Sequence, residues 1–171
     1  MNAIETHREG LRWAYELLEM VMDGVTGELA HANPPGIANP LAATYAHALV
    51  DLDVIPNLLL QENLPLYETA WKDKTGISDP QWQSDLEWAR RVRVDLPAAR
   101  EYGKAAYRSA DAYIAALNEA DLTREVDLTA NGLGVQTVSW CLTALVVAHL
   151  NNMAGEISVL KGIRGEKGYP F

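Results

Sequence analysis

Residues 39–53 read NPLAATYAHALVDLD, and this stretch decides the fold because it indicates a long helix, the second of the chain. Asn39 followed by Pro40 is typical of an N-cap and a first helical position. We expect the helix to bend or lose its regular hydrogen bonds at Pro56, which has no backbone amide and crowds the preceding turn. His47 and Asp51 lie one turn apart on a face that we expect to point inward.

Three other stretches predict long helices. In the first, Ile4, Leu11, Leu18 and Val25 recur every seven residues, which is the seam of a helix in a bundle. A second helix is predicted to start after Asp95, and its many alanines imply close approach to its neighbours. The last is predicted to begin near Thr137. Its inward residues are expected to be Leu142, Leu145, Val146, His149, Met153, Ile157 and Leu160.

The connections between these helices are long. Residues 31–40, HANPPGIANP, predict a loop, and short helices are expected at residues 67–72 and 81–93. Residues 121–135 alternate briefly and contain two glycines, which indicates an extended connector. Four long helices with three substantial connections predict an all-α protein, a four-helix bundle with long connections, in which residues 1–171 form a single domain.

Composition excludes several classes of function. The net charge of −9 repels phosphate and no basic stripe interrupts it, so we expect no nucleic-acid partner. No apolar run reaches the roughly 20 residues that cross a bilayer, so we expect no membrane partner and a cytoplasmic location. The lone cysteine, Cys141, fits a reducing compartment, and we expect it to be buried and inert.

His47 and His149 are the residues with the clearest capacity for chemistry. Two imidazoles that point inward from facing helices can hold a divalent metal ion, and bundle interiors are suited to this use. They can equally be neutral core histidines bonded to carbonyl or hydroxyl groups. Spacing alone favours the second interpretation, because two histidines do not complete a ligand set. His7 and His31 are assigned no role.

Two motifs resemble a known family. Residues 39–53 resemble the second helix of the DinB-like superfamily, in which Asn opens the helix and His follows eight residues later. Residues 149–171 resemble the last helix of that superfamily, with Gly155 and Glu156 in the expected places. The resemblance implies a DinB-like four-helix bundle that holds a metal ion with three histidines. It maps the first two onto His47 and His149 and the third onto Met153.

Methionine at position 153 implies a degenerate metal site. A thioether has poor affinity for divalent ions such as Zn, Ni or Mn, and on an inward stripe methionine is ordinary core filling. Asp51 can complete a face of two histidines and one carboxylate with His47 and His149, and Glu156 is a second possible replacement. Asp51 can instead fix the tautomer of a histidine without any metal. The cofactor is accordingly a divalent metal or none.

The resemblance also implies two possible functions. One is a metal-dependent enzyme acting on a small thiol, similar to the thiol transferases and maleylpyruvate isomerases of the superfamily, in which the ion lowers the pKa of the thiol. The other is a non-catalytic, metal-free homodimer that binds a small molecule or is associated with stress. In both cases we expect a homodimer.

Overall fold

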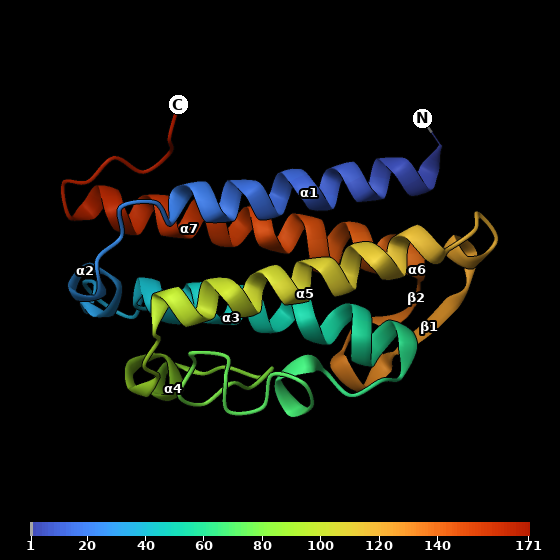
Figure 1. Cartoon of the computed structure of the whole chain (residues 1–171), viewed down its shortest axis with the longest axis horizontal. Coiled ribbons are helices and arrows are strands. Elements are labelled where there is room, and N and C mark those ends of the chain that lie inside the picture. The colour runs from blue at the N-terminus through green and yellow to red at the C-terminus, as the bar shows by residue number, and fades with distance from the viewer. Residues whose placement is uncertain (1) are drawn as a thin grey trace.

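The computed structural model describes residues 2–171, and its long helices lie side by side with a long connection along one flank (Figure 1). Helices α1 and α7 form one layer and α3 and α5 the other, and each helix contacts a helix of the opposite layer. The all-α prediction is therefore confirmed. The helices are α1 (Ala3–Val21), α2 (Gly27–His31), α3 (Leu41–Val54), α4 (Leu86–Arg91), α5 (Leu96–Ala116), α6 (Val138–Trp140) and α7 (His149–Ile163).

Several short elements complete the fold. Strands β1 (Glu125–Leu128) and β2 (Gly134–Thr137) pair antiparallel where an extended connector was predicted, and Glu125 lies opposite Thr137. Two π-helical segments, η1 (Ile55–Leu59) and η5 (Cys141–Ala148), continue α3 and lead into α7. Single 3₁₀ turns lie at η2 (Leu66–Glu68), η3 (Asp121–Thr123) and η4 (Thr129–Asn131). Among the described helices, none is both long and apolar enough to cross a membrane.

Helix α3 is the central helix of the structure. All its residues are described, and every one except His47 is buried. The seam of α1 supports it, because Leu11 and Leu18 are fully buried in the same apolar cluster. His47 is therefore the one position of α3 that is partly exposed.

Three predicted boundaries are wrong. Asn39 does not cap α3, because Pro40 occupies the cap in an extended conformation and no side chain caps the helix end. The ring of Pro40 fixes φ near a helical value but leaves ψ free, and its ψ of 147° is not helical, so the helix starts one residue later. The helix predicted at residues 67–72 is only the turn η2, and that predicted at 81–93 shortens to α4, whose N-cap is Asp85.

The helix starts at Asp95 and Thr137 are as predicted. The Asp95 side chain accepts a hydrogen bond from the backbone of Ala98 at the start of α5, and Thr137 accepts one from Trp140 at the start of α6. The predicted break at Pro56 is also confirmed, since the regular α-helix ends at Val54 and the chain continues as the π-helical η1. These local signals hold because each depends on neighbouring residues alone.

Candidate metal centre

Asp51 lies between two histidines from different helices. Its Oδ1 atom is 3.4 Å from Nδ1 of His47, one turn earlier on α3, and its Oδ2 atom is 3.2 Å from Nε2 of His149 at the start of α7. The two imidazole rings meet edge to face, with centroids 5.0 Å apart and an interplanar angle of 87°. Helical spacing brings His47 to Asp51, whereas the packing of α7 on α3 brings His149.

The three side chains fit a divalent metal ion. One ligand atom from each of them lies within 4.8 Å of the other two, and two nitrogens with one carboxylate form a common ligand set for such ions. Asp51 Oδ1 and His149 Nε2 are buried, and neither has an aligned hydrogen-bond partner among the described residues, although each is within charge-pair distance of a neighbour. Buried polar atoms without partners are costly, and a cation between them would satisfy both.

Burial sets the charge state of this cluster. It raises the pKa of Asp51 to about 8. Burial also lowers the pKa of His47, and burial together with the neighbouring His47 lowers the pKa of His149 to about 4. In the absence of an ion, the cluster at neutral pH is therefore two neutral imidazoles around a protonated carboxyl. Neutral imidazole is the form that binds a metal ion.

Comparison with known proteins agrees with this architecture. The profile of the DinB superfamily matches residues 11–157, which include His47, Asp51 and His149. This chain belongs to the DinB superfamily. A search of curated proteins gave no match.

A solved structure shares the DinB-like fold along almost the whole chain. It is the crystal structure of the conserved protein of a locus from Enterococcus faecalis, with a TM-score of 0.82 and 19% sequence identity. The alignment covers 97% of this chain and 99% of that one. At this identity the similarity shows the fold alone.

Met153 and Glu156, the two other positions taken from the DinB motif, lie outside the group of potential metal ligands. Met153 is buried in the apolar core one turn after His149 on α7, which suits a packing residue. Glu156 is exposed and lines a groove with Ile37, Asn39 and Leu160. The structure does not bring Glu156 into the group of potential ligands, because along α7 it lies most of a turn away from the direction of Met153. That Met153 occupies a histidine position of the superfamily stays a prediction.

Cys141, His7 and His31 also lie outside this group of potential metal ligands. Cys141 is fully buried, and burial raises the pKa of its thiol, as expected of an inert cysteine. His7 contacts the Ser139 hydroxyl at 3.0 Å and is not a member of the cluster. His31 has a structural role that the sequence did not reveal. Its Nδ1 contacts the Gly27 carbonyl at 2.8 Å, and its Nε2 accepts a hydrogen bond from the backbone of Val94.

Two polar residues near the cluster were missed at the level of sequence. Asp53 is fully buried and accepts hydrogen bonds from four groups that hold the chain after α3 in place. The Ser84 hydroxyl lies 3.5 Å from His47 Nδ1. An acidic residue inside an apolar helix was a signal for Asp53, whereas no local signal singles out Ser84 among the polar residues of its loop.

Proposed function

We propose that His47, Asp51 and His149 bind a divalent metal ion and that this DinB-superfamily protein uses it to activate a small thiol. The observation that carries the proposal is the convergence of two neutral imidazoles and a carboxyl whose buried polar atoms lack aligned partners. When bound, the ion supplies Lewis acidity, which favours the thiolate form of a coordinated thiol at neutral pH.

The residues of the chain have separate tasks in this function. His47 and His149 hold neutral imidazoles in a partly buried setting, and their lowered pKa values leave one nitrogen of each ring free of a proton. Asp51 supplies the single negative charge of the ligand set once its proton has left. Three ligands leave positions open to a substrate. The thiol comes from a small molecule, because Cys141 is buried and its thiol pKa is raised.

One observation favours the non-catalytic alternative. A protonated Asp51 between two neutral histidines carries no net charge, so the cluster is electrically balanced without an ion. In that case the group would be a remnant inside a metal-free small-molecule-binding protein. The homodimer expected from the sequence is compatible with both functions, and analytical ultracentrifugation tests it.

Elemental analysis tests the proposal. Untagged protein purified without chelator or affinity metal, then incubated with zinc, nickel or manganese and desalted, should retain near-stoichiometric ion. His149→Ala should lose it, and His7→Gln, a histidine substitution outside the cluster, should keep it. Absence of bound ion after all three incubations would end the metal-dependent function and leave the alternative.

A further inference from the structure

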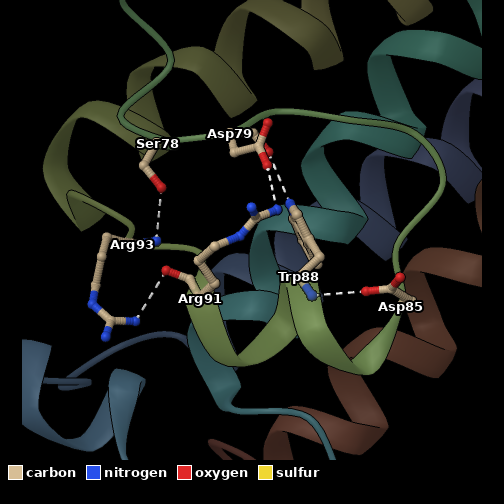
Figure 2. A network of polar contacts seen from close by, with 6 residues as sticks. All are labelled: Ser78, Asp79, Asp85, Trp88, Arg91 and Arg93. Carbon is tan, nitrogen blue, oxygen red and sulfur yellow. Dashed lines mark hydrogen bonds and ion pairs between the residues drawn. The ribbon is translucent and has the colours of Figure 1, made fainter.

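The loop at residues 78–85 passes beside the candidate metal centre, where Ser84 contacts His47. Trp88 of α4 bonds to both ends of this loop (Figure 2). The indole Nε1–H of Trp88 donates to the Asp79 carbonyl at 2.9 Å. Its backbone N–H donates to Asp85 Oδ1 at 2.7 Å. Because Trp88 is 2% exposed, both bonds are anchored in the core, and a single residue fixes the separation between the loop's ends.

Further bonds fix the start of the loop (Figure 2). Arg91 Nη2 donates to the Asp79 carboxylate at 2.9 Å. The Arg93 backbone N–H donates to the Ser78 hydroxyl at 2.9 Å, and the Ser78 N–H donates to the Arg93 carbonyl at the same distance. The loop is therefore held at both ends by α4 and the residues that follow it.

Ser84, which precedes the anchored Asp85, is the loop residue that reaches the cluster. Its hydroxyl lies 3.5 Å from His47 Nδ1, the same ring nitrogen that faces Asp51 Oδ1 at 3.4 Å. A hydroxyl can either donate to a bare ring nitrogen or accept from a protonated one. The position of Ser84 thus influences which nitrogen of His47 carries the proton and how the ring is turned.

We propose that Ser84 is a positioning residue for the His47 imidazole and that the indole N–H of Trp88 holds Ser84 in place. This inference rests on the proposed function for its effect on metal binding. A Ser84 hydroxyl that donates to Nδ1 leaves the proton of the neutral ring on Nε2, so the lone pair stays on the nitrogen that faces Asp51. The loop residue Ser84 and the buried Trp88 thereby belong to a site whose proposed ligands all lie on α3 and α7.

Substitutions that each remove one group test this inference. Ser84→Ala deletes the hydroxyl from an exposed position, where it leaves the core untouched, and Ser84→Thr keeps it. Trp88→Phe keeps an aromatic ring but deletes the indole N–H. Trp82→Phe is the matched control, because Trp82 lies on the same loop and its indole N–H donates no hydrogen bond to any residue that the structure describes. Cobalt(II) serves as the metal, since its visible absorption reports both affinity and ligand geometry.

We expect Ser84→Ala and Trp88→Phe each to weaken cobalt binding about tenfold and to shift its absorption band. The double variant should bind no more weakly than Trp88→Phe, because the two groups act in series. Ser84→Thr and Trp82→Phe should resemble the wild type. In metal-free protein, the imidazole ¹⁵N shifts of His47 should show a changed tautomer ratio in Ser84→Ala and Trp88→Phe only.

The outcomes separate this inference from the proposed function. If cobalt binds but Ser84→Ala leaves affinity, absorption and ¹⁵N shifts unchanged, Ser84 does not position His47 and the inference is overturned. Additive losses in the double variant would overturn the part assigned to Trp88. If the wild type binds no cobalt yet Ser84→Ala changes the tautomer ratio, the proposed function fails while the positioning of His47 stands.

Discussion

Asp51 Oδ2 lies 3.2 Å from Nε2 of His149, so a carboxyl group and an imidazole from distant parts of the sequence share one largely buried site. The carboxyl also faces His47 on its own helix, at 3.4 Å. Asp51 therefore links the histidine of α3 with the histidine of α7, and its protonation state sets the net charge of the cluster.

Asp51→Asn should stabilise the metal-free protein at alkaline pH. The pKa of Asp51 is about 8 when folded and 3.8 in its reference state, so the folded protein keeps this proton to higher pH. The stability that it contributes is greatest below pH 3.8 and is lost as pH rises toward 8. Asparagine cannot ionise, so the variant should gain about 2 kcal/mol over the wild type at pH 9. Urea unfolding from pH 5 to pH 9 in the presence of a chelator measures this gain.

The same titrations have a built-in control in the acid range. His149 is neutral in the fold down to about pH 4, whereas a histidine with the reference pKa of 6.5 takes up a proton earlier. The wild type and Asp51→Asn should therefore both lose stability from His149 as pH falls from 6.5 toward 4, because the unfolded chain takes up that proton first. A stability difference between variant and wild type that does not grow toward alkaline pH would show that Asp51 ionises as an exposed carboxyl does.

Metal binding at pH 7 should release about one proton per ion. Asp51 is mostly protonated at that pH because its pKa is about 8, and a ligating carboxylate must be ionised. Affinity should then rise about tenfold for each pH unit between 6 and 7.5. Calorimetric titration with zinc in two buffers of different ionisation enthalpy counts the proton. Equal heats in the two buffers would mean that Asp51 is not a ligand.

Met153→His should tighten divalent-metal binding at least tenfold and make thermal stability depend on metal. Met153 is buried one turn after His149 on α7, so a histidine there adds a nitrogen on the same stretch of helix. Ligand linkage then raises the melting temperature with added nickel or zinc. Met153→Leu is the control for packing. A Met153→His protein with no metal-dependent stabilisation would show that position 153 does not face the ion.

Asp53→Asn should destabilise the fold by about 3 kcal/mol. The carboxylate accepts from Asn57 Nδ2 at 2.8 Å, from the backbone of Leu66 and Tyr67 at 2.9 and 3.1 Å, and from the Tyr102 hydroxyl at 2.8 Å. An amide has one acceptor oxygen, so donors are left facing its NH₂ group. Tyr102→Phe removes one of these bonds and should cost about 1 kcal/mol. Chemical unfolding measures both, and equal stability of Asp53→Asn and wild type would contradict this role.

Part of the site was predictable from the sequence because it depends on helical spacing. His47 and Asp51 lie four residues apart, so they share a face of α3 wherever that helix packs. His149 falls on the inward stripe of the last helix, and the all-α fold follows from the apolar repeats of the long helices. The DinB resemblance added the expectation that the two histidines meet. The helix start at Asn39 was mispredicted, because a proline's φ suits a helix while its ψ remains free to be extended.

Only the tertiary structure decided the charge of Asp51 and the neighbours of His47. The raised pKa of Asp51 comes from burial, which depends on packing from several helices at once and not on any residue beside it in sequence. Ser84 reaches His47 because an indole on α4 ties the ends of its loop together, a contact that no local pattern encodes. The sequence by itself determined which faces the side chains occupy, because helix geometry is local. The assembled core decided which faces meet and how far water is excluded, because those are properties of the packed chain as a whole.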